Sequence, residues 1–414
     1  MANPVPVTYS SPVQKVAGGR WAKRTAGVSN YIETGNVDPA YTAIAGADGS
    51  EPAIALRPFG SYHIHFLFEI LNCAGKRPVF TVDSRDKSSD YHSSFRPVYS
   101  YDGETWVKAS SFTQLQSPRR VIFQFDEIFT QDRVLVASHM AYMLARSNEL
   151  ATRLKNDTSG MVYPSLGGDG TGTIGISLAE TTRGIQVGSN PMYGFRLSDS
   201  SQSPPGGKRR LLLTMGVHGG EILDGWMFRA IIEFFLTGVG AKANLFRKWW
   251  DVYAYWNISP NSRKAGEPRT NPTRGEDPNR DWGSADGATP YSFTETRAIR
   301  DAVFADLMSV HAHFDMHSSG GFIYESACNY YTDANQSLIA AYKSRFDALY
   351  PVPLWLDPSE AVNTLGRWSK DNLATQLNLT MEPALGRGKG RPELDNVGVA
   401  YASALADMTE DGVM

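Results

Sequence analysis

The sequence contains very little cysteine, which excludes a framework built on disulfides. Cys73 and Cys328 are the only two cysteines among 414 residues, too few to staple a chain of this length. The N-terminal stretch MANPVPVTYSS also lacks the basic start and the apolar segment of a secretory leader. We therefore expect a cytoplasmic protein.

Long apolar runs and a strong net charge are also missing. No stretch approaches the roughly 18 apolar residues that cross a bilayer, so we expect no membrane partner. The formal net charge is -3 and the pI is near 6.3, which gives no long-range field to attract nucleic acid. The hydrophobic content of 42% is enough for two domains with cores of their own. Composition gives no prediction of the oligomeric state.

The first part of the chain has the two-residue period of β-strands. In residues 62–70 the apolar positions from Ile64 onward alternate and share one face. Residues 120–126 repeat this pattern, and Asp102-Gly103 predicts a hairpin turn. We therefore predict an antiparallel β-sandwich domain over residues 1–155.

The end of this domain is predicted from a change in composition. Residues 146–154 have a helical pattern, and the polar, glycine-rich stretch 156–173 that follows predicts the domain junction. The Gly-Asp-Gly-Thr-Gly segment at 168–172 could suggest a phosphate-binding loop. No Lys-Ser/Thr follows it and no strong strand precedes it, so we predict a surface loop.

Beyond residue 205, apolar strands alternate with longer helical patterns, which is typical of an α/β domain. Strands are predicted at 211–217, 249–256 and 310–317, and helices at 221–236 and 293–308. We expect a mixed, largely parallel sheet flanked by helices over residues 156–414.

The first of these strands ends in Gly-Val-His-Gly-Gly-Glu, which carries His218 and Glu221. Glycines let the backbone turn sharply, so both side chains can reach one cation. This pair alone is a weak signal, since a helix-capping Glu beside a hydrogen-bonded His is the ordinary alternative. His317 is the candidate third ligand, because parallel strands gather functional residues at their carboxyl ends.

Two histidines and one carboxylate are the ligands of a catalytic zinc site. They leave a fourth position on Zn²⁺ open for water, and zinc lowers the pKa of that water to roughly 7. Such a site supplies hydroxide near neutral pH. The pattern therefore indicates a hydrolase.

Several short motifs in one order resemble the zinc metallocarboxypeptidase family, specifically its cytosolic carboxypeptidase branch. The resemblance covers nearly the whole chain and implies a carboxypeptidase-like α/β fold preceded by a β-sandwich. The motifs are Phe95–Trp106, Gly216–Glu221, Asp277–Trp282, Glu295–Ile299, Asp315–Ser318 and Thr380–Glu382.

By this resemblance, His218, Glu221 and His317 bind Zn²⁺. Asp277 orients His218 through the other ring nitrogen, a contact that metal-bound histidines normally need. The resemblance thus implies the cofactor together with its ligands.

The same resemblance implies how substrate is held. Asn279 and Arg280 bind the terminal carboxylate of the peptide, because a guanidinium donates two parallel hydrogen bonds to a planar carboxylate. Arg269 polarises the scissile carbonyl and stabilises the oxyanion. Its distance in sequence to Asn279 favours it over Arg263 and Arg274, which lie in the same loop.

Glu382 fits the general base, which takes a proton from water and returns it to the leaving amine. The branch usually has a tyrosine shortly before this glutamate, whereas residues 377–383 contain none. In the family a key residue of the specificity pocket lies about fifteen positions before the base, and here that position is Arg367. A buried cation there favours a C-terminal Glu or Asp, and an exposed arginine is the alternative.

Four further histidines are expected to be structural. His63 and His65 alternate with apolar residues on a strand and are expected at its surface or rim. His311 and His313 belong to a His-x-His-x-Asp-x-His pattern that resembles binuclear metallohydrolases with one residue inserted. No histidine follows residue 317 to complete such a site.

The sequence therefore predicts a zinc carboxypeptidase that acts on the C-terminus of a peptide or protein and releases an acidic residue. A zinc amidase or deacylase acting on small N-acyl amino acids would share the ligands. A binding module that holds C-termini without turnover is the alternative from another class.

Overall fold

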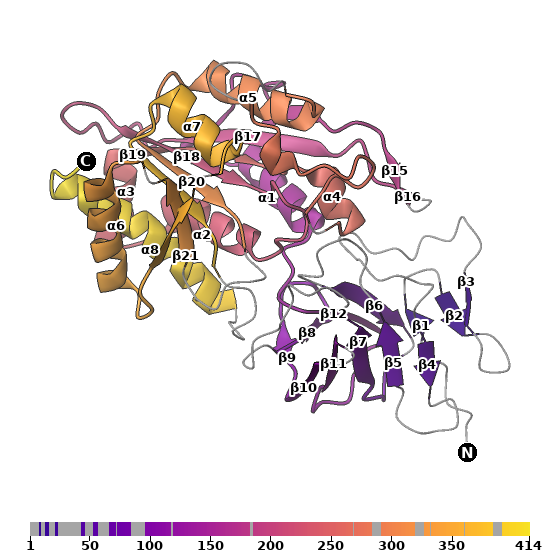
Figure 1. Cartoon of the computed structure of the whole chain (residues 1–414). Helices are drawn as coiled ribbons and strands as arrows, with labels where there is room; N and C mark the ends of the chain where they lie inside the picture. The colour runs from indigo at the N-terminus through magenta and orange to yellow at the C-terminus, as the bar shows by residue number, and fades with distance from the viewer. Residues whose placement is uncertain are drawn as a thin grey trace.

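Figure 1 shows the computed structural model of the chain, in which a smaller β domain lies below a larger α/β domain. The structure describes residues 66–71, 73–83, 96–116, 119–182, 185–267, 269–283, 291–318, 327–331, 333–359, 361–383 and 391–414, and five short strands nearer the N-terminus. Those strands are β1 (Thr8–Tyr9), β2 (Val13–Lys15), β3 (Trp21–Lys23), β4 (Ala43–Ala45) and β5 (Ala53–Leu56).

The smaller domain contains two five-stranded sheets, β1-β6-β12-β8-β9 and β10-β11-β7-β5-β4. Their pairs are antiparallel except for β5 and β7, which run parallel. The sandwich is therefore antiparallel as predicted, apart from this pair. The further strands are β6 (Leu67–Leu71), β7 (Val79–Asp83), β8 (Val98–Ser100), β9 (Val107–Lys108), β10 (Ser111–Gln116), β11 (Arg119–Gln124) and β12 (Arg133–Ala137).

Alternating apolar residues form the core between these sheets. Phe66, Phe68 and Ile70 are buried on one face, as the two-residue period predicts, and Phe66 stacks on Phe123 from the facing sheet at 5.8 Å between ring centroids. The predicted surface histidines His63 and His65 lie outside the described residues. The predicted hairpin joins β8 to β9, with Gly103 at a φ of +71°.

Helix α1 (Leu144–Lys155) makes buried contacts with the larger domain. The carbonyl of Ser147 accepts a hydrogen bond from Trp256 Nε1 at 3.2 Å, and the Ser147 hydroxyl donates to Asn257 at 2.6 Å. The stretch expected as a linker also contains β13 (Val162–Pro164), which pairs with β17 of the large sheet. We therefore propose a domain boundary between β12 and α1, earlier than residue 155.

The larger domain is built on one nine-stranded mixed sheet in the order β13-β17-β19-β18-β20-β23-β21-β22, with β14 also on β17. Strands β19, β18, β20 and β23 run parallel at its centre, as predicted. The remaining strands are β14 (Thr173–Ile176), β15 (Thr181–Thr182), β16 (Ile185–Gln186), β17 (Pro191–Leu197), β18 (Arg209–Met215), β19 (Trp250–Trp256), β20 (Ala312–Met316), β21 (Ala327–Tyr331), β22 (Trp355–Ser359) and β23 (Leu377–Met381). The predicted surface loop at 168–172 lies just before β14 as a turn in which Asp169 and Gly170 are exposed and Gly172 is buried.

Helices cover both faces of this sheet (Figure 1). Leu211, Leu213 and Met215 of β18 pack toward α2, α6 and α8, whereas Leu212 packs toward α5 and α7. The helices are α2 (Asp224–Thr237), α3 (Ala241–Trp249), α4 (Pro260–Ala265), α5 (Thr294–Asp306), α6 (Gln336–Leu349), α7 (Leu365–Leu373) and α8 (Arg391–Glu410), with the 3-10 helix η2 (Pro278–Arg280). In the part of the chain that the structure describes, no helix has the length and apolar character needed to span a membrane.

Candidate metal centre

The metal-binding candidates lie at the carboxyl ends of two adjacent strands. Strands β18 and β20 run parallel, with Met215 opposite Met316. His317 directly follows β20, and His218 lies in the turn after β18. The turn continues to Asp224 before α2 begins, so Glu221 lies in the turn and not in the predicted helix.

Two glycines allow this turn to reach the site. Gly216 has a φ of +88°, in the left-handed region that glycine adopts at little cost. Gly219 lies against the backbone of α4, where a Cβ atom would come within 2.5 Å of the carbonyl carbon of Ser262. A side chain at either position would shift the segment that carries His218 and Glu221.

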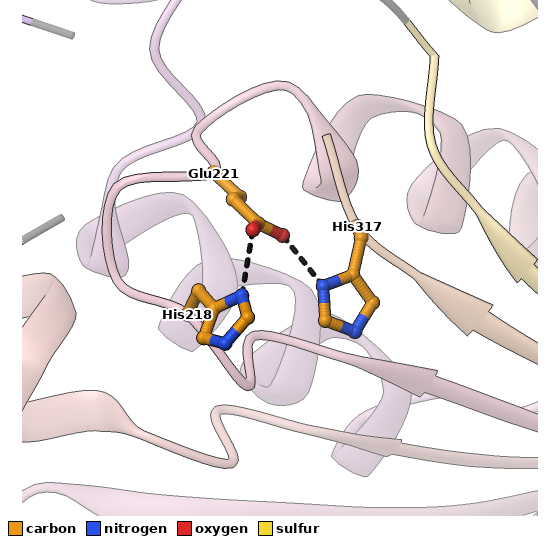
Figure 2. Close-up of side chains that lie close together, drawn as sticks. All are labelled: His218, Glu221 and His317. Atoms are coloured by element: carbon orange, nitrogen blue, oxygen red, sulfur yellow. Dashed lines mark hydrogen bonds and ion pairs between the residues drawn. The ribbon is translucent and has the colours of Figure 1, made fainter. Parts of the chain in front are cut away.

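Three side chains converge in a buried cluster (Figure 2). His218 Nδ1 lies 2.6 Å from Glu221 Oε1, and His317 Nδ1 lies 2.7 Å from Glu221 Oε2. The three ligand atoms all lie within 4.8 Å of one another. The side chains are nearly inaccessible, with residue exposures of 3%, 6% and 1% for His218, Glu221 and His317.

The far nitrogens of both imidazoles are held by carboxylates. His218 Nε2 lies 3.0 Å from Asp277, and His317 Nε2 lies 3.0 Å from Asp315. A carboxylate only accepts hydrogen bonds, so each Nε2 carries a proton, and each Nδ1 is the nitrogen that faces Glu221. His317 Nδ1 is a buried atom without an aligned hydrogen bond. Two Nδ1 atoms that converge on one carboxylate suit a shared cation, which would take the place of their protons, and two imidazoles with one carboxylate are a zinc-type donor set.

The electrostatics of the cluster favour positive charge. Burial alone would lower the pKa of both histidines, but Glu221 and Asp277 raise the pKa of His218, and Glu221 and Asp315 raise that of His317. Burial would likewise raise the pKa of Glu221, yet the two imidazoles hold that pKa well below its usual range. A carboxylate kept ionised in a buried site is suited to binding a cation.

Glu382 lies beside this cluster. It directly follows β23, which pairs with β20 so that Met381 lies opposite Met316. Burial, and then the charge of Glu221, raise the pKa of Glu382 to about 8. The candidate base is therefore close enough for the charges of Glu221, His218 and His317 to alter its pKa.

Asp277 connects His218 to the predicted substrate-binding residues. Its carboxylate accepts the Asn279 backbone N–H at 2.8 Å and pairs with Arg269 Nη2 at 2.8 Å. Asn279 is buried, and its side-chain oxygen accepts the N–H of Leu365 at 3.0 Å. Arg280 is exposed and donates to the carbonyl of Asn279.

Arg367 is not the buried, unmatched cation that the sequence implied. Its side chain is 32% exposed and pairs with Asp371 at 2.8 Å and Asp333 at 3.2 Å. It lies on α7, near the ring of Tyr331 at 5.8 Å. Two carboxylates therefore already balance its charge.

His311 and His313 have structural contacts, as predicted. His311 Nδ1 accepts the Arg210 backbone N–H at 3.0 Å, far from the metal-binding cluster along β20. His313 is fully buried and contacts the hydroxyls of Thr214 and Ser369. Asp315, which the sequence placed in a motif without a role, orients His317. Its position two residues before His317 on the same strand face was the available signal.

A buried ion pair, also unpredicted, supports the metal-binding turn. Arg263 binds both carboxylate oxygens of Asp224, at 2.9 and 2.7 Å, and both side chains are 1% exposed. Arg263 also donates to the carbonyl of Tyr142, which leads out of the smaller domain, and Tyr142 N–H donates to Ile222 at 2.8 Å. The turn is thus anchored from both domains.

No protein-family model matches the chain, and no curated protein matches it either. Solved structures are nevertheless similar. A metallo-carboxypeptidase from Burkholderia cenocepacia gives a TM-score of 0.71 at 18% identity, covering 94% of this chain and 99% of that one. A metallo-carboxypeptidase from Pseudomonas aeruginosa, in complex with (2-guanidinoethylmercapto)succinic acid, gives 0.68 at 17% identity with coverages of 94% and 99%. The chain therefore has the metallo-carboxypeptidase fold over nearly its whole length.

Proposed function

We propose that this protein is a zinc-dependent carboxypeptidase that hydrolyses the C-terminal bond of a peptide or protein. The observation that carries the proposal is the buried convergence of His218, Glu221 and His317, with their ligand atoms within 4.8 Å of one another. The shared fold supports it. The cytoplasmic location expected from the sequence stays a prediction.

Each polar side chain around the cluster has a task in such a reaction. A zinc ion held by His218, Glu221 and His317 supplies Lewis acidity and activates water near neutral pH. The carboxylate of Glu382 accepts a proton from the attacking water and passes it to the leaving amine nitrogen. The Arg269 guanidinium stabilises the negative charge that develops on the scissile carbonyl oxygen.

Recognition of a free C-terminus is assigned to Arg280 and Asn279. In the described part of the chain, the Arg280 guanidinium has no carboxylate partner, and it lies in the 3-10 helix that follows Asp277. An exposed guanidinium three residues after Asp277, which contacts His218, suits a ligand that brings its own carboxylate. This requirement distinguishes a carboxypeptidase from an endopeptidase.

Release of an acidic residue is the finer part of the proposal, and Arg367 alone carries it. Because Asp371 and Asp333 already pair with Arg367, an acidic side chain must compete with them. Asp333 has the longer contact with Arg367 and is also held by Lys370 at 2.7 Å. It could therefore leave Arg367 while keeping a partner.

The proposal is tested with peptides that differ only in the last residue, incubated with the zinc-loaded protein and with chelator-treated protein. We expect release of the terminal residue, its loss on chelation and its restoration by Zn²⁺. Glu382→Gln should bind zinc normally and turn over at least about 100-fold more slowly. A matched peptide with an amidated C-terminus should not be cleaved.

The alternatives give different results in the same assay. Turnover of N-acyl amino acids without peptide cleavage would establish the amidase instead. Peptide binding that Glu382→Gln leaves unchanged, with no release by the wild-type protein, would establish a binding module. An unaltered preference for Glu in Arg367→Ala would remove the acidic-pocket assignment while leaving the carboxypeptidase in place.

A further inference from the structure

A row of buried polar side chains runs beneath His317 on the α7 side of the sheet. His313 and Asp315 lie on β20, on the same face as His317, because alternate residues of a strand share a face. Thr214 lies opposite Asp315 on β18, and Asn378 lies opposite His313 on β23. All four are at most 1% exposed.

The number of hydrogens that each group can donate determines which group donates and which accepts along this row. Thr214 has one hydroxyl hydrogen, which it donates to Asp315 Oδ1 at 2.8 Å. His313 Nε2 lies 2.9 Å from the same hydroxyl oxygen, so Nε2 must be the donor there. In the neutral imidazole Nδ1 is then an acceptor, and the Ser369 hydroxyl at 2.8 Å donates to it. Asn378 Nδ2 in turn donates to Ser369 at 3.0 Å.

The hydrogen bonds of this row all run in one direction and end at the carboxylate of Asp315. Asn378 donates to Ser369, Ser369 to His313, His313 to Thr214, and Thr214 to Asp315. Asp315 also receives the Nε2–H of His317 at 3.0 Å. A chain of this kind polarises its members in the same direction, and its end point is the carboxylate that orients a metal-binding imidazole.

We propose that His313, with Thr214, is a positioning element for the metal. As a neutral Nε2–H imidazole, His313 holds the Thr214 hydroxyl hydrogen on Asp315. Asp315 is thereby fixed as an acceptor for His317 Nε2, and the His317 Nδ1 lone pair is kept on the cation. This inference rests on the proposed zinc site. It adds to that site a control of metal affinity by residues of β18 and β20 that do not themselves bind the metal.

A purely structural role for these residues makes a different prediction. A buried hydrogen bond that serves only the fold stabilises the metal-free and metal-bound states equally, so its loss leaves the zinc dissociation constant unchanged. Loss of partners behind a metal-binding histidine typically weakens metal affinity by about 10- to 100-fold. Zinc affinity and metal-free stability must therefore be measured separately.

The experiment uses the full chain and Zn²⁺ alone, with dissociation constants obtained by competition with a chelator. Thr214→Val keeps the shape of threonine but removes the hydroxyl, and we expect zinc binding about 10- to 100-fold weaker. Thr214→Ser keeps the hydroxyl and should bind zinc close to the wild-type value. Urea unfolding of the metal-free proteins reports stability independently.

His313 offers a matched pair. The amide nitrogen of Gln can take the place of Nε2 and donate to Thr214, whereas that of Asn corresponds to Nδ1 and cannot reach it. His313→Gln should therefore retain more zinc affinity than His313→Asn. Ser369→Ala, which removes the donor to Nδ1, should weaken binding in the same direction but less.

The results separate this inference from the proposed function. Wild-type zinc affinity in Thr214→Val, or equal affinity in His313→Gln and His313→Asn, would overturn the positioning role while leaving the carboxypeptidase intact. If Thr214→Val does not fold, the two His313 variants and Ser369→Ala decide the question. If the His218→Ala variant bound zinc as tightly as the wild-type protein, the metal site itself would be ruled out.

Discussion

The two histidines of the metal centre are held by carboxylates in very different surroundings. Asp277, behind His218, lies in a loop with its side chain 17% exposed and is shared with Arg269, itself 30% exposed. Asp315, behind His317, lies in the central sheet with its side chain 1% exposed. One imidazole is thus supported from a partly exposed loop, and the other from the core.

The difference indicates a division of labour. Groups near water can be replaced by solvent when a partner is lost, and they can move when a ligand enters. In the core, water cannot take the place of a lost partner, and the donor or acceptor that is left unpaired costs about 1–3 kcal/mol. In the proposed function, the His317 side would fix where the cation sits, while the His218 side would connect the cation to Arg269 and the residues proposed to hold substrate.

The largest effect is expected from the two Arg-Asp pairs that flank the centre. Arg263→Met leaves Asp224 buried without its partner, which typically costs about 3–5 kcal/mol. Burial already raises the pKa of Asp224 to about 6 with Arg263 present. Arg269→Met removes a partly exposed pair and should change stability by less than about 1 kcal/mol, but should lower kcat by about 100- to 1000-fold.

Urea unfolding and steady-state kinetics on both variants measure these effects. The matched substitution controls for side-chain size, because both replace arginine with the same residue. Equal destabilisation by the two variants would show that the exposed pair is as important to the fold as the buried one, and the proposed contrast would be lost.

A smaller effect is expected from the two carboxylates themselves. Asp315→Ala leaves the Thr214 hydroxyl and His317 Nε2–H unsatisfied in the core and should cost about 2–4 kcal/mol. Asp277→Ala exposes its former partners to water and should cost about 1 kcal/mol or less. Both should weaken zinc binding by about 10- to 100-fold. Chelator competition and unfolding of the metal-free variants distinguish the two; a larger stability loss in Asp277→Ala would reverse the assignment.

The same contrast explains what the sequence could predict. The grouping of His218, Glu221 and His317 was predictable because His317 directly follows one strand and the other two lie in the turn after another, and parallel strands bring such ends together. The position of Asp315 on the same strand face as His317 was a signal, but it did not by itself assign the role, which also depends on which His317 nitrogen Asp315 contacts. The Thr214 contact depends in addition on the register of β18 against β20.

Arg367 shows why sequence distance is a poor guide to a pocket. Counting from Glu382 locates the residue on α7 but does not show where its side chain points. Its partner Asp333 lies 34 residues earlier, so no local pattern reveals the pair. The proposed earlier domain boundary depends on contacts of the same kind: α1 follows the sandwich in sequence, yet it contacts Trp256 and Asn257 of the larger domain.

The last effect concerns acid, and it sharpens the contrast between core and surface. Burial lowers the pKa of His313 from 6.5 to about 4. Between these values the unfolded chain binds more protons than the folded one, so His313 contributes stability that is full above pH 6.5 and is lost as the pH falls toward 4. Asp277, whose pKa is held below its usual 3.8, contributes stability that is lost only below that pH.

His313→Gln removes the titrating group but retains a donor. The metal-free variant should therefore lose less stability than wild type between pH 6.5 and 4. The expected difference is about 1.4 kcal/mol for each unit by which the pKa of His313 differs between the unfolded and folded states. The histidines of the cluster do not interfere, because their raised pKa values alter stability only above pH 6.5. His311→Gln is the control: burial and Arg210 lower the pKa of His311 to about 4 as well, away from the metal. Urea unfolding at several pH values measures both. If only His311→Gln reduced the acid sensitivity, His313 would be protonated in the folded state, and the neutral imidazole that links Ser369 to Thr214 would have to be abandoned.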